Sequence, residues 1–188
     1  VGFSVMNRGD STGDNNIAMG SNALDRITTG SANIAIGRGA ATRLTTGNSN
    51  VAIGSSVMSL NAVEGGFNIA VGKDALDSLT TGKRNIAIGL SALQSCKEAN
   101  RNIAIGDVVA NDLELGEYNL FIGRNVADNT IGHENFKDNI AIGRYTFSNH
   151  GAAALSGTVS LGYQAKAIAN DQIRLGRDSA AVFVHTKN

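Results

Sequence analysis

The stretch SANIAIGRGAATRLTTGNSNVAIG, residues 31–54, contains the same phrase twice. A five-residue segment ending in Gly is followed by an Ala- and Leu-containing segment and by Thr-Thr-Gly, and then the five-residue segment returns. β-Branched residues in a short run are typical of a strand, and Gly at the end of a segment is typical of a turn. One unit of the chain therefore consists of a strand, a connecting segment and a glycine corner.

This strand segment recurs along most of the 188-residue chain. Its clear copies are Asn16–Gly20, Asn33–Gly37, Asn50–Gly54, Asn68–Gly72, Asn85–Gly89, Asn102–Gly106, Asn119–Gly123 and Asn139–Gly143. From Gly20 to Gly123 the closing glycines are 17, 17, 18, 17, 17 and 17 residues apart, and the later steps are 20, 19 and 14 residues. A constant period predicts stacked supersecondary units, none of which buries its apolar face alone.

Side chains in each strand segment alternate between two faces. Ile34 and Ile36 point to one face, whereas Asn33, Ala35 and Gly37 point to the other. We expect the Ile face to bury apolar area and the small Asn-Ala-Gly face to allow close approach of another backbone. Stacking would also place Asn above Asn, about 4.8 Å apart, where the side chains can form a hydrogen-bonded ladder.

The connecting segments carry apolar residues three, four and seven positions after the Gly, as at Ala23, Leu24 and Ile27. This spacing predicts one or two helical turns, which persist only when docked on their neighbours because helix nucleation is costly. Cys96 takes the seventh position of its unit, so we expect it to be a buried apolar filler and not a nucleophile. The predicted fold is mainly β, a parallel β-solenoid or β-roll-like stack with short helical turns.

Composition narrows the functional classes. Sixteen basic and sixteen acidic residues balance, so no long-range field favours nucleic acid or an anionic membrane. No apolar run approaches the roughly 20 residues of a membrane span. The three histidines have no paired metal-ligand spacing, so we expect neither a metal site nor a cofactor.

The chain divides into three parts by its periodicity. Residues 1–15 are a lead-in that we expect to continue from a longer chain, 16–123 are the regular stack, and 124–188 are an irregular distal region. Most aromatic residues and all three histidines lie after residue 117, where the segments 124–139 and 144–157 lengthen two units.

Irregular loops on a rigid scaffold often carry binding function, so we expect receptor contacts in this distal region. Aromatic rings can stack on sugars, while polar side chains supply hydrogen bonds. The candidate residues are Tyr118, His133, Glu134, Phe136, Lys137, Tyr145, Asn149 and His150. The alternative for the Phe residues is that they fill a wider core, and this is the favoured interpretation of Phe121, which takes an Ala position of the repeat.

The repeat resembles two groups of fibrous proteins. The AIG strand is similar to the head repeat of trimeric autotransporter adhesins, although those units are shorter. The Thr-Thr-Gly corner and the longer unit resemble the distal part of bacteriophage tail fibres and tailspikes more closely. The final stretch VSLGYQAKAIANDQIRLGRDSAAVFVHTKN, residues 159–188, is similar to the segment that precedes the self-cleaving intramolecular chaperone of endosialidase-type fibres, among them the L-shaped side tail fibres of T-five-like siphophages.

This resemblance implies a homotrimeric fibre at the host-contacting end of a virion, joined to upstream fibre segments and trimmed by its chaperone. A trimer also has a physical rationale, since a narrow stack has a small core and open strand edges that are aggregation hazards unless they are covered. A closed symmetric assembly is the usual solution.

The sequence is compatible with four functions. The leading hypothesis is a non-enzymatic domain that binds a host surface glycan, such as lipopolysaccharide O-antigen. A polysaccharide-degrading tailspike would need a carboxylate pair, for which Glu114 and Glu117 are candidates. An adhesin head and an ice-binding solenoid are the others, although adjacent Thr pairs do not provide the alternating Thr ranks of an ice-binding face.

Overall fold

The computed structural model describes residues 11–128, 136–147 and 155–177, and every regular element in these ranges is a β-strand. The strands are β1 (Ile17–Met19), β2 (Ile34–Ile36), β3 (Val51–Ile53), β4 (Ile69–Val71), β5 (Ile86–Ile88), β6 (Ile103–Ile105), β7 (Gly116–Glu117), β8 (Leu120–Ile122), β9 (Phe136–Lys137), β10 (Ile140–Ile142), β11 (Val159–Leu161) and β12 (Ile173–Leu175). The predicted β-solenoid is confirmed.

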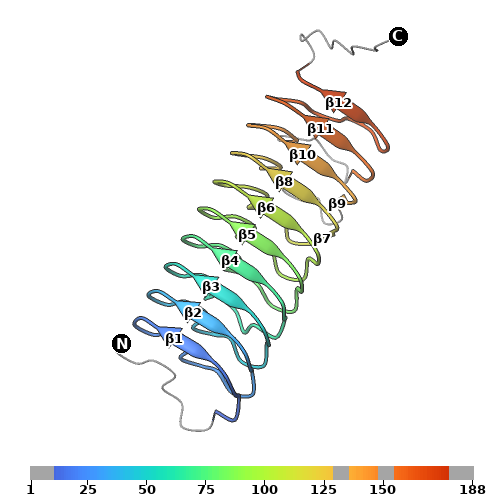
Figure 1. Cartoon of the computed structure of the whole chain (residues 1–188). Coiled ribbons are helices and arrows are strands. Elements are labelled where there is room, and N and C mark those ends of the chain that lie inside the picture. Colours follow the sequence, from blue (N-terminus) through green and yellow to red (C-terminus); the bar gives the residue numbers. More distant parts are fainter. Residues whose placement is uncertain (1–10, 129–135, 148–154, 178–188) are drawn as a thin grey trace, which may run out of the picture.

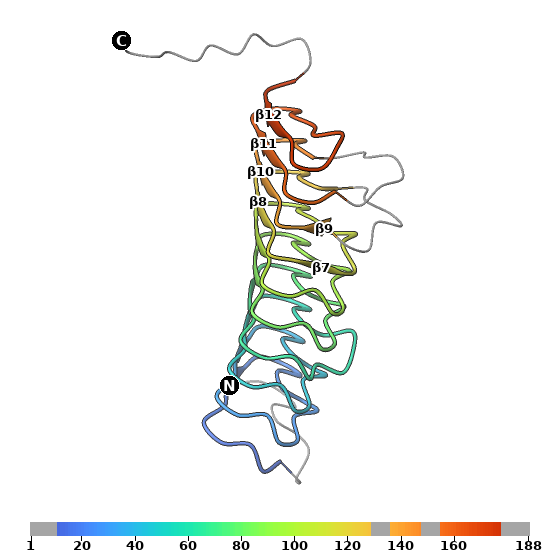
Figure 2. The ribbon, with the colours of Figure 1, turned by 90° about the vertical axis from the view of Figure 1, so that its right-hand side faces the viewer.

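Ten of these strands form one parallel sheet in the order β1-β2-β3-β4-β5-β6-β8-β10-β11-β12. Neighbouring strands pair in the register of the repeat, so that Ile34 lies opposite Val51 and Ala35 opposite Ala52. We call each strand with its return segment a tier. Figure 1 shows the strands following one another along a single axis, and Figure 2 shows them lining one side of the stack. A short second sheet pairs β7 with β9.

The two faces of the long sheet are the reverse of the sequence prediction. Asn33 and Ala35 are buried inside the tier, in the same interior as Leu44, whereas Ile36 on the outside keeps 36% of its surface exposed. The interior is filled mainly by small side chains from the strand and larger ones from the return segment. The Ile side chains of the strand therefore have no room there and point outward. The small face does allow a close backbone approach, but the approaching backbone belongs to the same chain.

The return segments are also not helical. The predicted apolar positions Ala23, Leu24 and Ile27 are all buried, but Leu24 has the left-handed φ of 50°. Its N–H donates to the carbonyl of Ala40 in the next tier, at 3.1 Å. Because the backbone donors of these segments alternate between bonds within a tier and bonds to the next tier, no i to i−4 helical series forms.

The Asn ladder is confirmed, and it lies in the interior. Asn85 Nδ2 donates to Asn68 Oδ1 at 3.1 Å and to the Ala99 carbonyl at 2.7 Å. Asn85 Oδ1 accepts from the backbone N and the Nδ2 of Asn102, at 3.0 and 3.2 Å. The same pattern runs from Asn16 to Asn139, where Thr158 takes the next position. Each central amide is therefore fully hydrogen-bonded, which removes the penalty of burying it.

Glycine closes each strand because the tiers are very close there. Gly54 has φ +134°, and a Cβ on it would lie 2.6 Å from the carbonyl oxygen of Gly72. A side chain at this position would meet backbone atoms, which cannot move aside without separating the tiers. The glycine spacing therefore marks the tier spacing.

The distal tiers have a larger core. Phe121 takes the inner position that is Ala in β1 to β6, and it is fully buried, as predicted. Its ring centroid lies 5.9 Å from that of Phe147, which in turn contacts Phe136 edge-on at 5.2 Å. These rings fill the space behind β8 and β10.

Candidate functional site

Four of the predicted receptor-binding residues lie in the described part of the chain: Tyr118, Phe136, Lys137 and Tyr145. The other four, His133, Glu134, Asn149 and His150, lie outside the described residues.

Tyr118 projects from the corner that immediately precedes strand β8. Its backbone is left-handed, with φ 58°, and 47% of its surface is exposed. The guanidinium carbon of Arg101, from the same corner of the preceding tier, lies 5.1 Å from the ring centroid. Tyr118 is therefore an accessible ring with a cation on one side.

Phe136 is a correction to the predicted set. Its side chain is fully buried against Phe147, so the ring is out of reach of a ligand. The longer distal segment brings this residue into the core, which is the alternative that the sequence left open for the Phe residues. Lys137 beside it is exposed, and its Nζ lies 3.9 Å from Glu117 Oε2, a loose surface ion pair between β9 and β7.

Tyr145 lies at the opposite end of the strands, after β10. It is 37% exposed, and its ring makes an edge contact with Tyr163 of the next tier, with a centroid separation of 6.3 Å. Arg144 Cζ lies 5.4 Å from the Tyr145 ring and 5.0 Å from the Tyr163 ring. Arg144 and Tyr163 were not among the predicted site residues, but the structure places both with Tyr145.

The predicted residues do not form one site. Tyr118 comes two residues before β8, and Tyr145 comes three residues after β10, so they lie at opposite ends of these parallel strands. Each end of the strands has its own group of rings and guanidiniums. The two groups would contact different parts of a large ligand.

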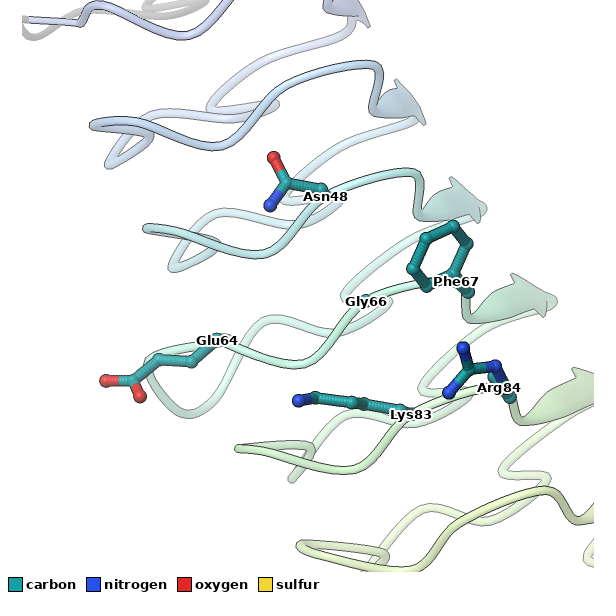
Figure 3. A pocket seen from close by; sticks show the side chains of 6 residues that line it. All are labelled: Asn48, Glu64, Gly66, Phe67, Lys83 and Arg84. Atoms are coloured by element: carbon teal, nitrogen blue, oxygen red, sulfur yellow. The ribbon is translucent and has the colours of Figure 1, made fainter.

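Sequence reasoning missed a hollow nearer the middle of the stack. It has a volume of about 240 Å³ and is lined by Asn48, Glu64, Gly66, Phe67, Lys83 and Arg84. Figure 3 shows Phe67 and Arg84 on successive tiers beside the strands, with Glu64 farther away along the return segments. A signal was present in the sequence: Phe67, Arg84, Arg101 and Tyr118 all occupy the position just before the ladder Asn, where earlier units carry Asn15, Ala32 and Ser49.

Two chemical possibilities can be assessed directly. Cys96 is fully buried, and burial raises the pKa of its thiol to about 12, so the sulfur fills space as predicted. Within the described ranges, no three His, Cys, Asp or Glu side chains are grouped so that they could hold a metal ion. The same ranges contain no helix that is long and apolar enough to span a bilayer.

Comparison with known proteins gave no relative from which a function could be transferred. No family model, no curated protein and no solved structure matches the chain. The repeat, the surfaces and their side-chain chemistry are therefore the features that indicate a function.

Proposed function

We propose that this chain is part of a trimeric receptor-binding tail fibre of a bacteriophage, carried on the virion, and that it binds a host surface polysaccharide such as lipopolysaccharide O-antigen. In this proposal the chain holds the polysaccharide during initial, reversible adsorption without cleaving it. The proposal combines the resemblance of the repeat to tail fibres with one feature of the fold, the outer face of the long sheet.

The outer face is aliphatic from one end to the other. Each strand of the long sheet places two side chains outward, and every one of them is Ile, Val, Leu or Met. One row is Ile17, Ile34, Val51, Ile69, Ile86, Ile103, Leu120, Ile140, Val159 and Ile173; the other is Met19, Ile36, Ile53, Val71, Ile88, Ile105, Ile122, Ile142, Leu161 and Leu175. At a strand spacing of about 4.8 Å, these rows run for about 43 Å.

Further copies of this chain are the occupants that fit this face best. A continuous apolar surface of this kind usually marks an interaction site. A second copy presents the same two rows at the same spacing, so side chains of one copy can enter the gaps between tiers of another over the whole length. Three copies around one axis would cover the apolar outer face of each copy and leave the polar corners exposed to solvent.

A trimer would also multiply weak glycan contacts. A single contact with an exposed ring or guanidinium contributes little binding free energy. Three equivalent sites on one rigid trimer raise the effective concentration of the second and third sites after the first has bound. This fits reversible adsorption to a polysaccharide, which repeats the same unit many times.

The assembly is tested by sedimentation equilibrium of the purified chain. We expect three times the chain mass of 19.4 kDa for the wild type, and dissociation for Ile88→Asp, which puts a charge in the middle of the outer face. Thr81→Asp, at an exposed corner outside that face, is the matched control and should remain trimeric. A monomeric or dimeric wild type contradicts the proposed fibre.

Recognition is tested on immobilised lipopolysaccharides and capsular polysaccharides from a panel of Gram-negative bacteria. The trimer should bind at least one of them, with much weaker binding by Ile88→Asp, and should release no new reducing ends. Release of reducing ends would favour the degrading tailspike instead. An intact trimer that binds no surface polysaccharide would leave a structural fibre without a receptor-binding role.

A further inference from the structure

We infer that the corner formed by Phe67, Arg84, Arg101 and Tyr118 is a binding site for an acidic glycan, one whose sugars carry carboxylates. We call these four residues the corner column. The inference builds on the proposed function, because it specifies the class of polysaccharide and places a site on the side of the stack. It depends on three observations about these residues.

The first observation is that each ring of the column has the guanidinium of a neighbouring tier beside it, at a similar distance in both pairs. Arg84 Cζ lies 5.4 Å from the Phe67 ring centroid, and Arg101 Cζ lies 5.1 Å from that of Tyr118. The column therefore begins and ends with an aromatic ring and has two guanidiniums between them. Three tier steps of about 4.8 Å separate the rings by about 14 Å, which suits several consecutive sugars of one glycan chain.

The second observation is that the column has unused binding capacity. Phe67 is 58% exposed, and both arginines are exposed. Within the described part of the chain, neither guanidinium lies within 4.0 Å of a carboxylate oxygen, although other cations such as Lys97 have acidic partners. A guanidinium can take a carboxylate through two parallel N–H bonds, and an aromatic face can pack against the apolar side of a sugar ring.

The third observation is that the backbone at this corner does not favour large side chains. All four column residues have left-handed φ values between 55° and 62°. Asn and Asp adopt this conformation most readily, and other tiers have Asn15 and Asp138 at the same corner. Four consecutive tiers instead carry a large ring or a guanidinium, which contributes nothing to the core.

A hollow adjoins the column at its Phe67 end and adds polar groups. Gly66 carries no side chain between Asn48 and Lys83, and the volume of about 240 Å³ opens at this point. Figure 3 shows Lys83 extending from the tier of Arg84 in the direction of Glu64. Lys83 adds a third cation for an acidic sugar. The Glu64 carboxylate can accept hydrogen bonds from sugar hydroxyls, and the Asn48 amide can accept from or donate to them. The single 18-residue step among the regular units, from Gly54 to Gly72, contains three of the residues that line this hollow, Glu64, Gly66 and Phe67.

A polynucleotide is the other polyanion that rings and arginines can bind. The observations favour a glycan, because the formal net charge of the chain is zero and the column contributes only two arginines at one corner, whereas nucleic acid binding uses an extended basic surface. Binding of nucleic acid at this corner would contradict the inference.

The test measures binding of the wild-type chain to two acidic probes, hexagalacturonate and a hexamer of sialic acid, by isothermal titration calorimetry at low salt. Fully methyl-esterified hexagalacturonate has the same sugars without the negative charges, and a dT oligomer tests nucleic acid. We expect binding of at least one acidic hexamer, weakening as salt increases, and at least tenfold weaker binding of the ester and of dT. Binding of neither acidic probe, or equal binding of dT, overturns the inference.

The variants use residues that the fold already accepts at this corner. Arg84→Asn with Arg101→Asn copies Asn15, and Phe67→Ser copies Ser49, so the left-handed backbone is retained. We expect the double variant to lose about tenfold in affinity per guanidinium, which is about 1.4 kcal/mol each, because each arginine loses its charge-assisted hydrogen bonds to a carboxylate. Arg26→Gln removes an exposed guanidinium elsewhere and should bind like the wild type.

Failure of this inference can be distinguished from failure of the proposed function. A chain that is trimeric and binds only neutral polysaccharides keeps the proposed function and loses the acidic site. If the arginines pair with carboxylates of a neighbouring subunit, the double variant dissociates in sedimentation equilibrium and the acidic hexamers do not bind, which also overturns the inference.

Discussion

The regular tiers and the distal tiers solve the same packing problem with different side chains. In β1 to β6 the inner strand position is always Ala, and the return segments provide residues such as Leu24, Leu76 and Leu93. In β8 that strand position is Phe121, although β10 has Ala141 again, and after β10 Phe147 replaces the Leu, Met or Ala found at the equivalent left-handed corner elsewhere. The Asn ladder and the glycines that close the strands therefore define the tier, while the side chains that fill its interior can change with the length of the return segment.

The strongest disruption should come from the element that both regions share. Asn85→Leu removes an amide that bonds to the tiers on both sides. It leaves the Ala99 carbonyl, the Asn102 backbone N–H and one Nδ2 proton of Asn102 without partners, whereas Asn68 Oδ1 keeps its bond from the backbone N–H of residue 85. At about 1–3 kcal/mol for each buried unsatisfied group, we expect a loss of about 3–6 kcal/mol in the free energy of unfolding. Chemical denaturation followed by circular dichroism measures this loss.

The control for that variant is Asn48→Leu, which changes an exposed Asn whose Oδ1 accepts from Ser31 N and whose Nδ2 donates to the Thr46 carbonyl. Its loss should be about 1 kcal/mol or less. Equal losses for the two variants would mean that the ladder does not define the tier.

Removing the distal filling should cost slightly less than breaking the ladder. Phe147→Ala keeps a residue type that the corner already carries at Ala110 and Ala127, so the backbone stays compatible and only the ring is lost. We expect about 3–5 kcal/mol from the cavity next to Phe121 and Phe136. Thermal denaturation of the variant and the wild type measures the change.

A much smaller loss for Phe147→Ala would show that the neighbouring rings collapse into the space. In that event the distal core would be as adaptable as the regular one, and the contrast between the two regions would weaken.

The reverse exchange tests whether the regular tiers could accept the distal filling. Ala87→Phe puts a ring at the inner position of β5, where the return segment has its ordinary length. We expect overpacking to cost about 1–3 kcal/mol, because no longer segment makes room for the ring. Differential scanning calorimetry should show a lower Tm, and an unchanged Tm would mean that the lengthened segments are not what accommodates Phe121.

The smallest effect should come from Cys96, which fills a regular tier. Burial raises its pKa from 9.0 to about 12, so the unfolded chain loses the thiol proton at lower pH than the folded chain. The folded state therefore keeps its full stability below pH 9 and loses part of it as pH rises from 9 towards 12. Cys96→Ala should lack this part of the pH dependence, as measured by denaturation at several alkaline pH values.

Native Cys96 should also resist alkylation by iodoacetamide at pH 8, where both burial and protonation protect the sulfur. Rapid labelling of the folded protein would contradict its placement in the core.

Much of the fold was predictable because each repeat of the sequence corresponds to one tier. The regular spacing of glycines such as Gly37 and Gly54 predicted the stack, and the position of Asn at the start of each strand segment predicted the ladder. The inner and outer faces were predicted in reverse, because hydrophobicity alone places Ile inside, whereas the narrow interior of a tier selects by volume. The helical turns were wrong because an offset pattern at Ala23, Leu24 and Ile27 is satisfied equally by a left-handed corner, whose hydrogen bonds reach another tier.

The site was less predictable, since it depends on which corners stack. Aromatic enrichment identified Tyr118 and Tyr145 but not the guanidiniums of Arg101 and Arg144 that accompany them. It also included Phe136, whose ring is buried. Phe67 was passed over because it lies in the regular part, although it replaces a small residue at a fixed position of the unit.

The Asn ladder has a sense of direction. Each amide donates from Nδ2 to the preceding amide and accepts through Oδ1 from the following one, so the side-chain dipoles all point the same way. A segment running the opposite way would set donor against donor at one junction. Any polypeptide that prolongs this column at either end must therefore wind in the same sense, which makes the rod a polar object that can be lengthened only head to tail.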